Sequence, residues 1–214
     1  MILFVDTLLV LMILSAFLLL GSSRLGACIR FVAFQGFLVG LFPLVVGTYG
    51  PSLRVVIIAL VIVASKGIAF PVLLSRALRE SETNREVQPF VGYGLSLLFG
   101  LISLVVSFQL DNRLGLPPHY SSDLVVPVSF FMMMGGLFLI VARKTAVNQV
   151  VGYLVLENGI SVFGLALVRD IPVLIEMGVL MDVFVAVLVM GIAIYRINRE
   201  FDHIDSDRLN QLKG

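Results

Sequence analysis

Long apolar runs separated by short polar breaks occupy nearly all of this 214-residue chain. A helix needs about 20 apolar residues to cross the hydrocarbon core of a bilayer, and the runs are close to that length. Glycine, proline and charged residues collect in the breaks, where helices begin and end. The pattern therefore predicts an all-α, polytopic membrane protein with about seven transmembrane helices. The expected spans are residues 2–20, 31–48, 55–75, 89–109, 124–142, 147–168 and 171–195.

The basic residues are distributed unequally between alternate breaks, and this predicts the orientation of the chain. The breaks after the first, third and fifth spans, together with the tail at 196–214, hold 11 of the 15 Lys and Arg residues. The breaks after the second, fourth and sixth spans hold 3, and Lys66 lies inside a span. Because Lys and Arg favour the cytoplasmic side of a membrane, we expect the N-terminus outside and the C-terminus in the cytoplasm.

The composition agrees with a membrane protein and excludes other classes. Hydrophobic residues make up 59% of the chain and charged residues 14%, with a mean hydropathy of +1.05. A soluble domain has roughly a quarter charged residues. The net charge of +1 gives no reason to expect a nucleic-acid partner. Cys28 is the single cysteine, which excludes an intrachain disulfide, and His119 and His203 fall outside the spans, so we expect no metal site.

Four charged residues lie within the expected spans, where a charge costs about 2.5–3.5 kcal/mol on insertion scales. Lys66 is near the middle of the third span and Glu157 is near the middle of the sixth. Asp182 lies at a similar depth in the seventh span, judged from a rise of about 1.5 Å per residue, whereas Glu176 is nearer the outer surface. From this shared depth we expect Lys66 to reach Glu157 or Asp182.

A polar stripe runs along the sixth span. Gln149, Tyr153, Glu157 and Ser161 follow one another at four-residue spacing, which places them on one face of a helix. Such a face is turned toward protein or water and away from lipid. The same span carries three glycines that would let neighbouring helices approach closely, namely Gly152, Gly159 and Gly164.

Two roles are compatible with these buried groups. Burial favours the neutral form of a carboxyl group and a nearby ammonium favours its charged form, so a small change in the local field can load or unload a proton. The groups would then form a proton or ion path. Alternatively, one ion pair would only fix the packing of the helices. Three charges at one depth together with a polar stripe favour the path. Its candidate residues are Glu157, Lys66, Asp182, Glu176 and Tyr153.

Several segments of the chain resemble hydrogenase-4 component E. They are residues 151–159 (VGYLVLENG), residues 175–182 (IEMGVLMD), residues 209–214 (LNQLKG), Ser23-Arg24-Leu25, and Lys66 with Pro71. From about Pro127 onward the chain is also similar to subunit K of respiratory complex I and to the small three-helix component of multisubunit cation/proton antiporters. These resemblances divide the chain into four extra N-terminal helices (1–123), a three-helix subunit-K-like unit (124–195) and a cytoplasmic tail (196–214).

The resemblance implies a non-catalytic membrane subunit of an energy-converting hydrogenase or complex-I-like assembly in the inner membrane of a prokaryote. Such subunits connect a hydrogenase or dehydrogenase arm to large antiporter-like subunits, and they hold no redox centre, so we expect no cofactor. By resemblance Glu157 matches the family's membrane glutamate and is the expected relay for protons or Na⁺. Asp182 stands where a third-helix carboxylate would be, with Glu176 as a competing candidate, and Lys66 would tune the relay.

Three other roles stay open at this point. The chain could belong to a cation/proton antiporter that has no redox arm, or it could be a purely structural spacer between larger subunits. A stand-alone transporter is the third alternative, although the two halves of the chain show no inverted repeat.

Overall fold

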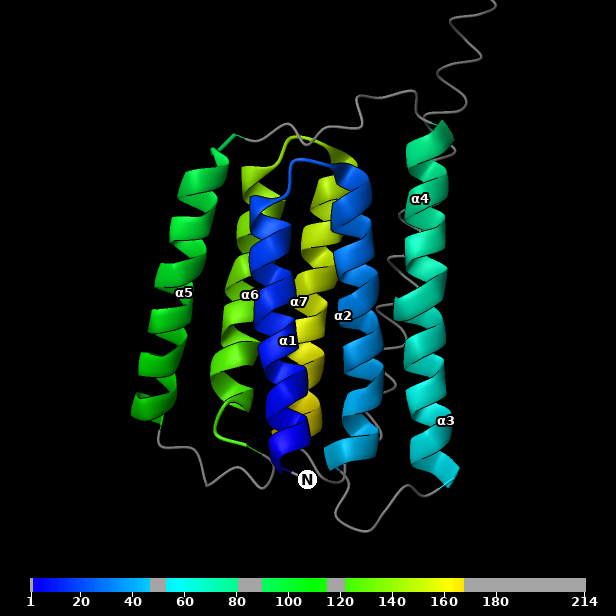
Figure 1. Ribbon diagram of the computed structural model, residues 1–214, viewed down its shortest axis with the longest axis vertical. Coiled ribbons are helices and arrows are strands. Elements are labelled where there is room, and N and C mark those ends of the chain that lie inside the picture. Colours follow the sequence, from blue (N-terminus) through cyan, green and yellow to red (C-terminus); the bar gives the residue numbers. More distant parts are fainter. Residues whose placement is uncertain (1, 47–52, 81–89, 115–121, 168–214) are drawn as a thin grey trace, which may run out of the picture.

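The computed structural model describes residues 2–46, 53–80, 90–114 and 122–167, and the elements in these ranges are all helical. Successive helices run in opposite directions in one bundle (Figure 1). This part of the chain confirms the predicted all-α class. In chain order the elements are α1 (Ile2–Gly21), α2 (Leu25–Val46), α3 (Leu53–Ile62), the π-helix η1 (Val63–Ala69), α4 (Phe70–Glu80), α5 (Tyr93–Leu114), α6 (Val125–Ala142) and α7 (Ala146–Leu167).

The elements α3, η1 and α4 follow one another without a break and form a third rod, so the described residues contain counterparts of the first six expected spans. The seventh expected span, 171–195, lies outside the described residues, as does the tail. Helix α2 begins at Leu25, before the expected start at residue 31, and α5 continues to Leu114, beyond residue 109. Both helices extend past their apolar runs because backbone hydrogen bonding, unlike hydropathy, continues through polar residues such as Arg30 and Asp111.

Five helical segments among the described residues are long and apolar enough to cross a membrane: Ile2–Gly21, Leu25–Val45, Val55–Arg76, Tyr93–Leu114 and Val125–Ala142. Helix α7 is not one of these five segments. Large apolar side chains such as Leu101 and Val105 on α5 and Ile57 and Ile68 on the third rod are exposed. Exposed apolar faces of this extent are typical of a multi-pass membrane protein, in which lipid or neighbouring subunits cover them.

The centre of the bundle is formed by α1, α2, α6 and α7. Helix α5 packs against α6 and α1 on one side, and the third rod packs against α2 on the other (Figure 1). Their buried side chains include Leu9, Met12, Phe42, Phe131 and Val155, each at most 1% exposed. The third rod, which carries Lys66, and α7, which carries Glu157, both pack against α2.

Helices α6 and α7 approach each other most closely where glycines face the partner backbone. A Cβ on Gly152 would lie 2.8 Å from the backbone nitrogen of Ile140, and a Cβ on Gly159 would lie 2.8 Å from the Ser129 carbonyl oxygen. Real Cβ atoms are not found that close to a backbone atom, so only glycine fits at these two positions. This confirms the prediction that Gly152 and Gly159 let neighbouring helices approach closely. Gly164 is also buried on α7.

Candidate functional site

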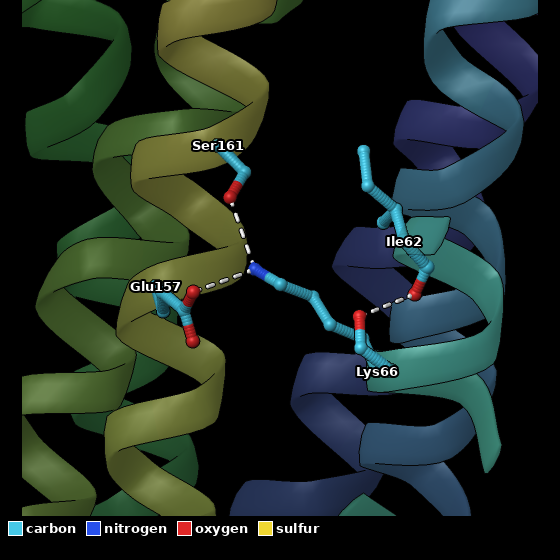
Figure 2. Close-up of polar contacts among 5 residues, drawn as sticks. Ile62, Lys66, Glu157 and Ser161 are labelled. Carbon is cyan, nitrogen blue, oxygen red and sulfur yellow. Dashed lines mark hydrogen bonds and ion pairs between the residues drawn. The ribbon is translucent and has the colours of Figure 1, made fainter. Parts of the chain in front are cut away.

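A buried ion pair joins the third rod to α7. The Nζ atom of Lys66 lies 2.9 Å from Oε1 of Glu157, and both side chains are less than a tenth exposed. The same ammonium donates a hydrogen bond of 3.1 Å to the hydroxyl oxygen of Ser161, one turn further along α7. Figure 2 shows the lysine side chain extending across the space between the two helices to both partners. The contact between Lys66 and Glu157 that was predicted from depth alone is confirmed.

Lys66 lies in the π-helical segment η1, just before Pro71. Pro71 has no N–H to donate, and its ring would collide with the carbonyl of Gly67 in a regular α-helix. Widening of the preceding turn relieves this conflict, and the backbone N–H of Phe70 bonds to the carbonyl of Ser65, five residues earlier. Single π-turns of this kind redirect a side chain relative to its neighbours, and they are frequent at functional sites. The Ser65 hydroxyl adds a hydrogen bond of 3.2 Å to the Ile62 carbonyl (Figure 2).

Two glycines of α2 let η1 lie close enough for Lys66 to reach α7. A Cβ on Gly36 would lie 2.6 Å from the carbonyl carbon of Lys66 and 2.7 Å from its oxygen. One turn further along α2, a Cβ on Gly40 would collide with Val63. These four-residue-spaced glycines form a small-residue contact like those found between membrane helices. The sequence contains this spacing, but only the structure shows that it faces the Lys66 backbone.

The carboxylate of Glu157 is held by charge attraction more than by hydrogen bonds. Neither of its oxygens has a partner with hydrogen-bond geometry among the described residues. A buried charge normally needs both a counter-charge and hydrogen bonds to offset the loss of water. Glu157 therefore keeps unused acceptor capacity on its buried carboxylate, which can accept a hydrogen bond or a proton.

The other predicted site residues have different surroundings. Tyr153 lies one turn before Glu157 on α7, is half-buried, and packs against the apolar core. Gln149, one turn earlier again, is exposed, so the stripe passes from the exposed end of α7 to the buried ion pair. Asp182 and Glu176 lie outside the described residues.

Arg143 is a buried residue whose placement the sequence did not indicate. It was expected only as one of the basic residues in a break, yet its side chain is 1% exposed. Its guanidinium donates a 2.9 Å hydrogen bond to the Leu20 carbonyl near the end of α1 and a 3.4 Å bond to the Ser96 hydroxyl on α5, and it stacks over the Tyr93 ring at 5.1 Å. Burial lowers the pKa of Arg143, although a guanidinium stays charged in proteins. Arg143 ties α1 and α5 to the end of α6.

A second set of buried polar residues lies on α1, α2 and α5. Gln35 of α2 is fully buried, and its Nε2 atom donates a hydrogen bond of 3.1 Å to the hydroxyl oxygen of Ser15 on α1. Ser103 of α5 is 1% exposed. The only sequence signal for these residues was a polar side chain within an apolar run, which is weak for serine and stronger for glutamine. Among the described residues, no group of three or more His, Cys, Asp or Glu side chains could hold a metal ion.

The fold and the site define a class, that of helical membrane proteins that keep a lysine–glutamate pair buried between their helices. Comparison with known proteins narrows the class. The family model of NADH-ubiquinone/plastoquinone oxidoreductase chain 4L matches residues 124–214, the same region that resembles subunit K of complex I. No solved structure matches the chain.

Curated relatives extend the similarity into the N-terminal helices. An uncharacterized protein of Mycobacterium tuberculosis is 29% identical over 204 residues, which cover 94% of this chain and 92% of that protein. Hydrogenase-4 component E of Escherichia coli K12 is 28% identical over 152 residues, or 70% of this chain and 69% of the relative, and the Shigella flexneri protein of the same name gives the same values. The predicted resemblance to hydrogenase-4 component E is confirmed.

Proposed function

We propose that this protein is a membrane subunit of a hydrogenase-4-like, complex-I-related assembly, and that the Lys66–Glu157 pair is part of its proton path. The support for the assembly is the similarity to hydrogenase-4 component E and to oxidoreductase chain 4L. The proposed setting is the inner membrane of a prokaryote, with the N-terminus outside and the C-terminus in the cytoplasm. The proposed partners are antiporter-like membrane subunits and the membrane anchor of a hydrogenase arm.

The single observation that supports the path most strongly is the 2.9 Å contact between Lys66 Nζ and Glu157 Oε1 within the bundle. When Glu157 is charged, the ammonium of Lys66 offsets the cost of burying the carboxylate. When a proton binds Glu157, that attraction is lost and Lys66 keeps its hydrogen bond to Ser161. Any charge arriving nearby then decides whether the proton stays or leaves, which is the property that a relay needs.

The remaining predicted residues have subordinate places in this proposal. Tyr153 lies between the exposed Gln149 and the pair on the same face of α7, and its proposed role is to assist proton entry along that helix. Asp182 is the proposed next acceptor, with Glu176 nearer the outer surface. In this proposal the redox chemistry takes place in other subunits, and proton movement through this chain is coupled to it. The transported ion could instead be Na⁺, and measuring whether pumping depends on Na⁺ would distinguish the two ions.

The test is to purify the intact assembly with Glu157→Gln and compare it with the wild type after reconstitution into liposomes. Redox turnover and proton translocation are measured on the same preparation. We expect the variant to assemble and to lose proton translocation, with turnover falling in step wherever the two are tightly coupled. Asp123→Asn, which neutralises an exposed carboxylate before the start of α6, is the matched control and should translocate protons normally.

The outcomes also separate the rival roles. If Glu157→Gln pumps as many protons per turnover as the wild type, the pair is structural and the chain acts as a spacer between larger subunits. If the subunit and its membrane partners exchange cations for protons without any redox arm, the antiporter role applies.

A further inference from the structure

Buried polar side chains on α1, α2 and α5 lie at the same level of the bundle as the Lys66–Glu157 pair. We call Ser15, Gln35 and Ser103 the α1–α5 polar arm. Their side chains are 3%, 0% and 1% exposed. They come from three helices, of which α1 contacts both α2 and α5, and α2 and α5 lie on opposite sides of α1 (Figure 1). In a bundle whose interior is otherwise mainly Leu, Val, Met and Phe, three such groups at one depth need an explanation.

Contacts between the helices establish the shared level. Gly36 touches the backbone of Lys66, so its neighbour Gln35 lies at the depth of the ion pair. Gln35 is bonded to Ser15, which places α1 at that depth as well. A Cβ on Gly100 of α5 would lie 3.0 Å from the Phe17 ring of α1. Because α1 and α5 run in opposite directions, Ser103, about one turn beyond Gly100, lies near the level of Ser15.

The hydrogen bonds within the arm are incomplete. The carbonyl oxygen Oε1 of Gln35 and the hydroxyl oxygen of Ser103 are buried and have no hydrogen-bond partner among the described residues. Ser15 already donates to the Met12 carbonyl at 2.9 Å while it accepts from Gln35. An unsatisfied buried polar atom costs about 1–3 kcal/mol, and in folded proteins such atoms are satisfied by ordered water.

We propose that Gln35 and Ser103 bind water molecules that connect the Glu157 carboxyl to the α5 side of the subunit, a second branch of the proton path. This inference rests on the proposed function of the pair. A proton released from the Glu157 carboxyl passes to the first water, and each water passes one proton to the next. Gln35 and Ser103 do not titrate; they are positioning residues that accept hydrogen bonds from the waters. The ammonium of Lys66, 2.9 Å from Glu157 Oε1, compensates the carboxylate that the departing proton leaves behind.

The test uses the intact reconstituted assembly with Gln35→Leu and with Ser103→Ala. Two quantities are measured: the rate of proton translocation, and the infrared bands of bound water, identified by their shift in ¹⁸O-labelled water. We expect each variant to lose bound-water bands and to translocate protons about fivefold more slowly, which corresponds to the loss of roughly one hydrogen bond.

Ser107→Ala is the matched control. Ser107 is equally buried, one turn further along α5, but its hydroxyl already donates to the Ser103 carbonyl at 2.7 Å. It should keep both the water bands and the translocation rate. Unchanged bands and rates in Gln35→Leu and Ser103→Ala would overturn the second branch. That result is distinguishable from failure of the proposed function, in which Glu157→Gln itself leaves proton translocation intact.

Discussion

At the scale of single residues, the buried charges are the most costly feature of this protein. Lys66 and Glu157 are each 5% exposed, and they compensate each other across the bundle. Removing both charges from such a pair is often tolerated, whereas removing one leaves the other buried without its counter-charge. The energetic role of the pair can therefore be separated from its proposed role in proton transfer by comparing single and double substitutions.

We predict that Lys66→Met destabilises the subunit by about 3 kcal/mol, because Glu157 keeps its burial and loses its counter-charge. The double variant Lys66→Met/Glu157→Gln should be more stable than Lys66→Met alone, since no uncompensated charge remains. The measurement is the thermal midpoint at which the subunit dissociates from the detergent-solubilised assembly, arranged as a double-mutant cycle. Additive effects of the two substitutions would contradict the pairing.

Arg143 illustrates a different use of a buried charge. Its hydrogen bonds go to the Leu20 carbonyl and the Ser96 hydroxyl, so it connects helix ends that are distant in sequence. Lys144, the next residue, is exposed and lies 5.0 Å from the ring of Phe90. Two adjacent basic residues thus serve separate purposes, one joining the helices inside the bundle and the other covering an aromatic ring at its surface.

At the scale of elements, the packing of the helices decides where Lys66 points. The π-helical turns of η1 precede Pro71, and Gly36 and Gly40 of α2 allow this wider segment to approach. A regular α-helix without the π-turn would rotate the residues on either side of it relative to one another. The local backbone and the glycines of the neighbouring helix together place the ammonium against α7.

We predict that Gly36→Ala pushes η1 away from α2 and weakens the Lys66–Glu157 contact, because the new methyl group would meet the Lys66 carbonyl group at about 2.6–2.7 Å. Overpacking of this kind costs about 1–3 kcal/mol. Stability of the subunit and proton translocation by the assembly should both fall. Gly67→Ala, within η1 itself, is the control, since the nearest atom to its Cβ is the Phe37 nitrogen at 3.7 Å. Equal losses of stability and proton translocation in the two variants would contradict the proposed effect of the spacing between α2 and η1 on the Lys66–Glu157 contact.

At the scale of the whole molecule, the helices alternate in direction, so the polar breaks fall at two opposite ends of the bundle (Figure 1). The junctions between α1 and α2 and between α6 and α7 share one end, and that end also holds the last turn of α4. Arg24, Arg76 and Lys144 lie at this end, and the positive-inside rule is the reason for our proposal that it faces the cytoplasm. The outer surface of the bundle is apolar on several sides, as lipid and neighbouring subunits require.

We predict that a membrane-impermeant maleimide labels Asp123→Cys in intact cells and leaves Ser23→Cys unlabelled until the cells are opened. Both positions are exposed and lie at opposite ends of the bundle. Cys28 is 3% exposed and is replaced by alanine in the background, so that each variant has one thiol. The reverse labelling pattern would invert the orientation derived from the basic residues.

The sequence by itself determined the class of the protein and the identity of its most informative residues. Apolar runs of membrane-spanning length give helices, because the backbone groups of a lipid-exposed segment must bond to one another. Charged residues within such runs are costly, so their presence marked Lys66 and Glu157 without any structure. Their common depth followed from the fixed rise of a helix, and the four-residue spacing of the stripe followed from its periodicity.

Only the tertiary structure decided which helix faces which and how closely. Depth allowed Lys66 to reach either Glu157 or Asp182, and the packing of both η1 and α7 against α2 brings it to Glu157. Arg143 looked like any basic residue in a polar break, yet it is buried by the converging ends of α1, α5 and α6. Periodicity fixes the face of a helix on which a residue lies, but the neighbour of that face depends on close packing between segments far apart in sequence.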